Sequence, residues 1–346
     1  MQKLKGLATG IGSLPHKDAQ LALDLVFKYC PRIPFWPQLP KRDIREGMVN
    51  QYSENIPCLK LSGADLVFDP QDKEKELEIF YEKIIGIDLE HFKISQEYAL
   101  GLYAFYGRLK SVPGLLEKIE FIKCHITGPF TFAASIKDET DRLLLADPIF
   151  MQVCVKGLLM KALWQIKFLR GLGKKIIVFI DEPYLAGFGS AYTPLNKEDI
   201  VKGLTELTEG IKEEDVLVGV HCCGNTDWPI FTDIKTIDIV NFDAFGYLDK
   251  FILYAGNLNE FLKRGGVICW GIVPTQLFTG QESVDLLIRK LKEGLNALIN
   301  KGIEEDLLLN NLLISPSCGI GTFDVRKAEK VFGLLAETSA FIQEYL

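Results

Sequence analysis

Residues 216–223 read VLVGVHCC, and this stretch decides the fold. A near-continuous run of Val and Leu is typical of a parallel strand that is buried on both faces. Side chains alternate along a strand, so His221 and Cys223 point to one face while Cys222 points to the other. The stretch therefore predicts a buried parallel strand that ends in two metal-ligating side chains on the same face.

Seven further runs of the same kind occur along the chain. They are residues 7–13, 33–38, 121–127, 175–180, 237–242, 266–270 and 312–315. Most are followed by helical patterns, which include residues 17–29, 148–172, 197–212, 283–301 and 325–345. Eight strand–helix units are typical of a (β/α)8 TIM barrel, an α/β fold that reaches this length as one unit. We therefore expect residues 1–346 to form a single TIM-barrel domain.

One stretch, residues 51–115, exceeds the minimal unit between the second and third strands. Its short apolar runs at 58–61 and 66–69 surround the turn-forming letters SGAD, a pattern typical of a hairpin. Helical patterns follow at 73–85 and 95–109. We interpret the stretch as an insertion at the mouth of the barrel.

Composition excludes several classes of protein. With 48% hydrophobic and 25% charged residues, the chain can bury a large core and is not a disordered protein. A net charge of -7 without a dense Lys/Arg cluster argues against nucleic acid as a partner. No signal peptide or membrane span is evident, so we expect a cytoplasmic protein without a membrane partner. The eight cysteines are then thiols, most of them core or surface residues, and His16 and His125 are expected to be structural.

Catalytic residues in this fold lie at the carboxyl ends of the strands. The eighth strand ends near Cys318, and a closed sheet would bring this thiol beside His221 and Cys223. Two thiols and an imidazole that leave one position open are typical of a zinc site. Asp243, after the sixth strand, is either a further ligand or neighbour of the metal, or a solvated loop acid. The sequence therefore predicts a metal site formed by His221, Cys223, Asp243 and Cys318.

Two other strand ends carry polar residues with alternative interpretations. Asp181-Glu182-Pro183 follows the fourth strand and either serves the site or caps the next segment. Gly12-Ser13 follows the first strand and is by itself only a weak signal for a turn or a phosphate-binding loop.

Five segments at these strand ends together carry a family resemblance. They are Ile11-Gly12-Ser13-Leu14-Pro15, Thr127-Gly128-Pro129, Ile180-Asp181-Glu182-Pro183, His221-Cys222-Cys223 and Ser315-Pro316-Ser317-Cys318-Gly319. In this order, and spread over nearly the whole chain, they resemble the catalytic, carboxyl-terminal barrel of cobalamin-independent methionine synthase. The letters HCCGNT at 221–226 are also similar to the uroporphyrinogen-decarboxylase-like branch, which includes zinc-dependent methylcobalamin:coenzyme M methyltransferases.

The resemblance implies a role for each matched residue. His221, Cys223 and Cys318 match the family's zinc ligands, and Asp243 stands where the synthase pattern has a glutamate ligand. An aspartate in place of the glutamate keeps the negative charge but has a shorter side chain.

The substrate residues implied by the resemblance lie on the other strand ends. Asp181 matches the acid that holds the amino group of the substrate, and Ser13 matches the group that binds its carboxylate, together with the backbone of Ile11 and Gly12. Asp181 and Ser13 are thus the predicted catalytic residues. The family's second amino-group acid has no counterpart after the second strand, where residues 35–40 read FWPQLP.

The resemblance implies a cytoplasmic enzyme of methionine biosynthesis, a zinc-dependent methyltransferase that transfers a methyl group to a thiol, with homocysteine as the favoured acceptor. The donor is methyltetrahydrofolate or a methylated corrinoid protein, since the chain has the length of one barrel where the full synthase has two. The alternatives are a methylcobalamin:coenzyme M type of enzyme, a metal-free uroporphyrinogen-decarboxylase-like enzyme and a non-catalytic module that binds zinc or a corrinoid partner.

Overall fold

A computed structural model describes residues 4–63, 65–190, 193 and 195–346, so the start of the chain and Ala64 in the predicted hairpin turn lie outside the described residues. Within these ranges, seven parallel strands form one sheet in the order β1-β9-β8-β7-β6-β5-β4. The strands are β1 (Leu7–Ala8), β4 (Phe121–Thr127), β5 (Lys175–Asp181), β6 (Val216–Cys222), β7 (Ile239–Phe242), β8 (Val267–Val273) and β9 (Leu312–Pro316). The sheet confirms the α/β class and the parallel arrangement expected from the apolar runs.

The sheet curls so that one face encloses an inner core. Side chains from the first and last strands of the sheet, such as Leu7 and Phe121, belong to one small buried cluster with residues of the strands between them. Alternate residues of the same strands, such as Ile122 and Val178, belong to a larger cluster beneath the helices. This two-sided burial explains the near-continuous apolar character of the strands.

The second expected strand, residues 33–38, is wrong as a regular strand. Prolines occupy every third position in residues 31–40, which we call the proline segment. Proline has no backbone N–H and cannot continue a ladder in the middle of a sheet. The segment therefore makes only isolated parallel bridges, Ser13 to Gln38 on one side and Phe35 to Lys123 on the other. The structure is a curled seven-stranded sheet that resembles a TIM barrel, and its eighth side is not a continuous strand.

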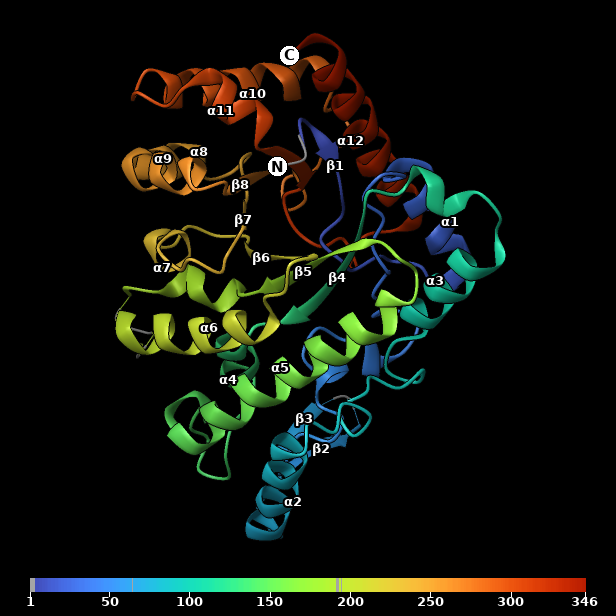
Figure 1. The fold of residues 1–346 in the computed structure, drawn as a ribbon, viewed down its shortest axis with the longest axis vertical. Helices are drawn as coiled ribbons and strands as arrows, with labels where there is room; N and C mark the ends of the chain where they lie inside the picture. Colours follow the sequence, from blue (N-terminus) through green and yellow to red (C-terminus); the bar gives the residue numbers. More distant parts are fainter. Residues whose placement is uncertain (1–3, 64, 191–192, 194) are drawn as a thin grey trace.

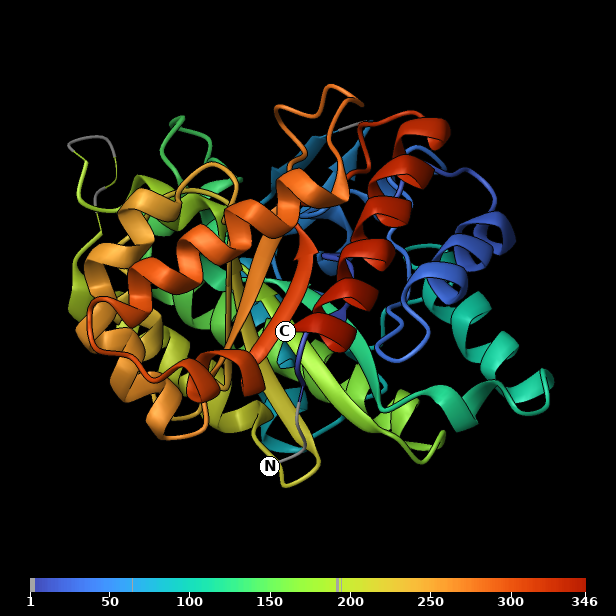
Figure 2. The same ribbon diagram turned by 90° about the horizontal axis from the view of Figure 1, so that it is seen from above.

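Helices surround the outside of the sheet (Figure 1). They are α1 (Ala19–Tyr29), α2 (Lys73–Ile85), α3 (Leu100–Ser111), α4 (Pro129–Ala134), α5 (Pro148–Arg170), α6 (Lys197–Ile211), α7 (Pro229–Thr232), α8 (Leu248–Phe251), α9 (Ala255–Lys263), α10 (Val284–Ile299), α11 (Glu305–Asn310) and α12 (Val325–Tyr345). Side-chain caps begin several of them: Asp18 accepts two backbone N–H groups of α1, and Asp147 does the same for α5. Figure 2 shows α10 and α12 lying along the outside of β8 and β9.

Helix α5 is long and apolar enough to cross a membrane by length and composition alone, which the sequence reading did not anticipate. Two thirds of its most apolar window are buried within the fold. The helix packs against α4, α6 and the sheet, so its apolar character is that of a core helix.

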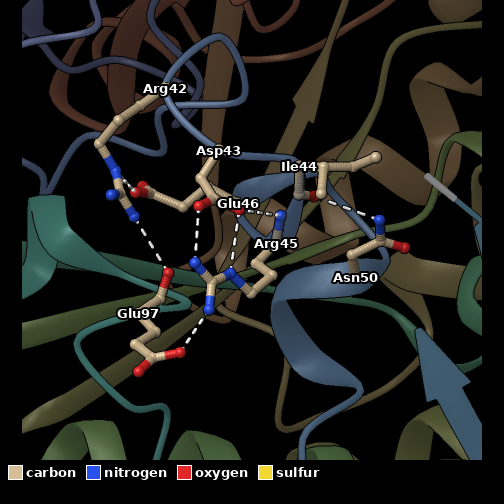
Figure 3. Close-up of polar contacts among 7 residues, drawn as sticks. All are labelled: Arg42, Asp43, Ile44, Arg45, Glu46, Asn50 and Glu97. Atoms are coloured by element: carbon tan, nitrogen blue, oxygen red, sulfur yellow. Dashed lines mark hydrogen bonds and ion pairs between the residues drawn. The ribbon is translucent and has the colours of Figure 1, made fainter. Parts of the chain in front are cut away.

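The stretch between the proline segment and β4 contains the expected hairpin, in which β2 (Leu59–Ser62) pairs antiparallel with β3 (Asp65–Phe68). Helix α2 follows as expected and projects away from the sheet in Figure 1. Helix α3 begins at Leu100 rather than at 95, because residues 95–99 form a turn that is held by the loop after the proline segment. Figure 3 shows this contact, in which Arg42 donates to the Glu97 carbonyl and Arg45 pairs with the Glu97 carboxylate.

Candidate metal centre and substrate site

Three of the four predicted metal ligands converge in the structure. His221 lies near the end of β6, Cys223 follows directly after that strand, and Cys318 follows β9. One ligand atom from each lies within 4.8 Å of the others. Side-chain alternation along β6 and the curl of the sheet thus bring together residues that are distant in the sequence.

A buried hydrogen bond orients the imidazole of His221. Its Nδ1 contacts Oδ1 of Asn241, its neighbour in register on β7. The Asn241 amide donates to the Cys269 carbonyl at 2.9 Å and to Ser315 Oγ at 2.8 Å, so its oxygen faces His221. Nδ1 of His221 then carries the proton, and Nε2 keeps a free lone pair.

Sequence reasoning missed Asn241. It lies two residues before Asp243 and faces the same side of β7, and only the register between β6 and β7 places it opposite His221. Strand alternation around Asp243 was the available signal, but it does not reveal the cross-strand partner.

The electrostatics of the cluster favour a thiolate. A hydrogen bond from Cys318 lowers the pKa of Cys223, burial opposes this, and His221 lowers the pKa further. The same hydrogen bond and burial raise the pKa of Cys318. Burial disfavours the protonated His221 ring, but the contact with Cys223, the charge of Asp181 and the hydrogen bond with Asn241 together outweigh burial and raise the pKa of His221. A thiolate is the form of cysteine that binds metal.

These residues fit a zinc ion. Nε2 of His221 is buried and has no hydrogen-bond partner among the described residues, so it is free to act as a ligand. Zinc takes histidine nitrogen and cysteine sulfur at about 2.0–2.3 Å in tetrahedral geometry, which puts two ligands about 3.5 Å apart. The three ligand atoms all lie within 4.8 Å of one another, so small side-chain adjustments would bring them to this spacing. One tetrahedral position would remain for a substrate.

The cluster of His221, Cys223 and Cys318, which we call the metal group, does not include Asp243. Its Oδ1 accepts backbone N–H groups from Phe245 at 3.0 Å and Gly246 at 2.8 Å, which shapes the turn after β7. Burial raises the pKa of Asp243, and the nearby Cys223 raises it further. The side chain therefore lies within electrostatic range of the cluster while one oxygen holds the loop.

Asp181 lies at the end of β5, in register with His221 on one side and Thr127 on the other. Its Oδ1 is buried without a hydrogen-bond partner in the described part of the chain. Burial raises the pKa of Asp181 to about 6, and the nearby His221 and Lys123 oppose this shift. An unsatisfied carboxylate oxygen beside the metal group is available to a positively charged ligand group.

The segment Ile11–Ser13 lies against the loop that carries Cys318. Ser13 Oγ accepts the backbone N–H of Gly321 at 3.2 Å, and the Ser13 carbonyl accepts that of Ile320 at 3.1 Å. A side chain at Gly319 would collide with Ser13 Oγ, because a Cβ there would lie 2.3 Å from it. Ser13 is thus next to Cys318 in space, as expected from the strand ends.

Glu182 caps a helix, but not the segment that follows it, as one of the two expectations had it: its side chain makes no cap at residues 183–187 and instead binds the start of α4. Its carboxylate accepts the backbone N–H groups of Phe130 at 3.0 Å and Thr131 at 2.8 Å, together with the Thr131 hydroxyl at 2.6 Å. It therefore caps the start of α4 from β5. Gly128 makes room for it, since a Cβ there would lie 2.2 Å from the Glu182 carboxyl group.

The comparisons with known proteins give one distant sequence relationship. No family model matches the chain. The chain is 25% identical over 296 residues to a methionine synthase of Methanocaldococcus jannaschii, covering 82% of this chain and 85% of that relative. A GH138 enzyme targeting pectin rhamnogalacturonan II is similar in structure with a TM-score of 0.31 and 13% identity, over 73% of this chain and 36% of that one. That level of structural likeness supports no conclusion, whereas the sequence match shows a distant relationship to a methionine synthase.

Proposed function

We propose that this chain is a zinc-dependent methyltransferase that transfers a methyl group to the thiol of homocysteine. The observation that carries the proposal is the convergence of His221, Cys223 and Cys318 within 4.8 Å, next to the unsatisfied carboxylate of Asp181. The distant methionine synthase relative supports a methyltransferase-like enzyme. All eight cysteines are free, which fits a reducing compartment such as the cytoplasm.

Zinc bound by these three residues would supply a site where the acceptor thiol loses its proton. The residues of the chain do the rest. Asn241 holds the His221 ring in one orientation, and Asp181 presents a carboxylate oxygen to the ammonium group of the acceptor. Ser13, held by Gly321, lies beside the Cys318 loop and marks the place of the acceptor carboxylate. Holding two reactants in line can contribute ~7 kcal/mol or more. We therefore expect positioning by these side chains to contribute more to catalysis than deprotonation of the thiol.

The metal site is tested by zinc analysis of purified variants. We expect Cys223→Ser and Cys318→Ser each to lower the bound zinc strongly, because each removes a thiolate ligand. Cys222→Ser is the matched control, since Cys222 is buried on the opposite face of β6 and contacts the Gly224 carbonyl. Undiminished zinc in both ligand variants would contradict the proposed site.

The reaction is tested by crossing two methyl donors with two thiols. Methyltetrahydrofolate and methylcobalamin are each offered with homocysteine and with coenzyme M. We expect methionine to form from homocysteine with one of the donors, and the productive donor decides between folate and a corrinoid protein. Methylation of coenzyme M alone would show that the acceptor is that of the coenzyme M branch and not homocysteine. Absence of any turnover by zinc-loaded protein would contradict the proposal that the chain is an enzyme.

A further inference from the structure

The imidazole of His125 is a buried polar group that the proposed mechanism leaves unused. His125 lies on β4 and is 2% exposed. Both of its ring nitrogens are buried and lack a hydrogen-bond partner among the residues that the structure describes. Each such atom lowers the stability of the fold by about 1–3 kcal/mol, so a histidine with a purely structural role in this position would be destabilising.

The surroundings of the ring do not satisfy it. One face stacks on Trp36 with ring centroids 4.0 Å apart. The ring also lies against Gly12, where a Cβ would come within 3.0–3.2 Å of three ring atoms. The neighbouring cation, Lys123, donates to the Ile11 carbonyl at 2.5 Å. These contacts fix the plane of the imidazole and leave its two polar atoms without a partner.

The position of His125 connects the two parts of the substrate site. Its ring touches Gly12, the residue before Ser13. On β4 it lies two residues before Thr127, which is in register with Asp181 on β5. Asp181 is in turn in register with His221. Going around the curled sheet, the order is therefore Gly12, His125, Asp181 and the metal group.

The chemistry of a neutral imidazole matches an α-amino acid. Burial lowers the pKa of His125 well below its ordinary value, and the nearby Lys123 lowers it further. A neutral ring offers one N–H donor and one lone-pair acceptor. The amino-acid end of a ligand offers the complement, an ammonium group that donates and a carboxylate that accepts.

We propose that His125 binds the amino-acid end of the thiol acceptor together with Asp181, accepting a hydrogen bond from the ammonium group. The assignment rests on the proposed function. The proline segment, which borders the same side of the site, offers no carboxylate. Its two polar residues are already engaged: Arg32 pairs with Glu120, and Gln38 donates to Gln51 at 2.8 Å. His125 is thus the polar side chain on this side of the site that can complete recognition of the acceptor, and it makes the site specific for thiols that carry an amino-acid group.

The test is isothermal titration of zinc-loaded protein with homocysteine and with 4-mercaptobutyrate, which lacks only the amino group. In wild-type protein homocysteine should bind more tightly. His125→Phe keeps a ring that can stack on Trp36 and should weaken homocysteine binding by about tenfold or more while leaving 4-mercaptobutyrate within about twofold. His125→Gln, which keeps one donor and one acceptor, should restore part of the loss. The control is His91→Phe, which makes the same change in the stretch between α2 and α3, outside the sheet, and should behave as wild type.

The outcomes separate the assignment from the proposed function. Unchanged homocysteine binding in His125→Phe, or an equal loss for both thiols at full zinc content, would overturn the role of His125 while the enzyme proposal stands. Zinc-loaded wild-type protein that binds neither thiol would overturn the proposed function and this assignment with it.

Discussion

Two carboxylates at the end of β5 lie next to each other in the sequence and on opposite sides of the sheet. On the outer side, Glu182 accepts three hydrogen bonds from the start of α4. On the inner side, Asp181 has one oxygen without a hydrogen-bond partner in the described residues. Burial raises the pKa of both groups, to about 7 for Glu182 and about 6 for Asp181. Two buried carboxylates thus have different roles. Glu182 stabilises the start of α4, and Asp181 keeps an oxygen that is available to a ligand.

The inner side repeats this pattern on three neighbouring strands. His125 on β4, Asp181 on β5 and His221 on β6 all carry buried polar atoms without partners in the described ranges. Buried polar groups in folded proteins are almost always paired, so this cluster of exceptions is what the proposed function predicts, with a bound ion and substrate as the missing partners. Four predictions test this contrast between the two sides of the sheet.

The largest effect is expected from Glu182→Ala. The change leaves the N–H groups of Phe130 and Thr131 and the Thr131 hydroxyl without their acceptor, so we expect the free energy of unfolding to fall by about 3–5 kcal/mol in urea denaturation. The control is Asp181→Asn, which should not lower the free energy of unfolding, because it removes a buried charge that burial disfavours. A loss below about 1 kcal/mol for Glu182→Ala would show that the cap is unimportant.

Asp181→Asn should have the opposite profile in a kinetic assay. Loss of the carboxylate charge that faces the acceptor ammonium should lower kcat/KM for homocysteine by about 100-fold, or about 2.7 kcal/mol of transition-state stabilisation. Zinc content should not change, because Asp181 is not in the metal group. Retained activity with homocysteine would remove Asp181 from the substrate site.

The hydrogen bond from Asn241 should tune the metal. Asn241→Leu removes the acceptor that orients His221, and such changes typically cost 10–100-fold in metal affinity. Competition with a zinc chelator measures this affinity. Asn241→Asp keeps an acceptor oxygen and is the matched variant that should retain most of it. Equal affinity in wild type and Asn241→Leu would show that ring orientation does not depend on this contact.

The last prediction concerns the pH dependence of stability on the outer side of the sheet. The pKa of Glu182 is about 7 in the folded protein against an ordinary 4.5, so the folded state holds a proton that the unfolded chain releases between these values. The contribution of the protonated group is present below about pH 4.5 and is lost as the pH rises through about 7. Urea midpoints from pH 5 to 8 should therefore shift in favour of Glu182→Gln relative to wild type. A constant difference between the two proteins would contradict the raised pKa.

Periodicity predicted the regular part of the fold. The runs that form β4 to β9 are buried on both faces, and this burial requires the near-continuous apolar residues that the sequence shows. The same reasoning failed at residues 33–38, where Pro34 and Pro37 interrupt the backbone donors that a ladder needs. It also overestimated the first strand, which is regular only over Leu7–Ala8.

The candidate site was predictable where one strand defines it. His221 and Cys223 follow from alternation along β6, and Cys318 from the assumption that parallel strands end at one edge. Asn241, the capping role of Glu182 and the unpaired ring of His125 depend on which strands are neighbours and in what register. Such contacts between elements leave no pattern within one segment, so the sequence could not reveal them.

The proline segment has a consequence for how the molecule opens. Between β5 and β6 a continuous ladder must break before an amide can exchange with solvent, whereas the segment is attached by single bonds such as Gln38 N to the Gly12 carbonyl and Lys123 N to the Pro34 carbonyl. Amides at this junction should exchange with deuterium quickly, through small local openings. Amides of β5 and β6 should exchange slowly, because their exchange requires global unfolding. Gly12 and Trp36 border this junction and also contact His125, so the side of the site that opens most easily is the side where we propose that the acceptor binds.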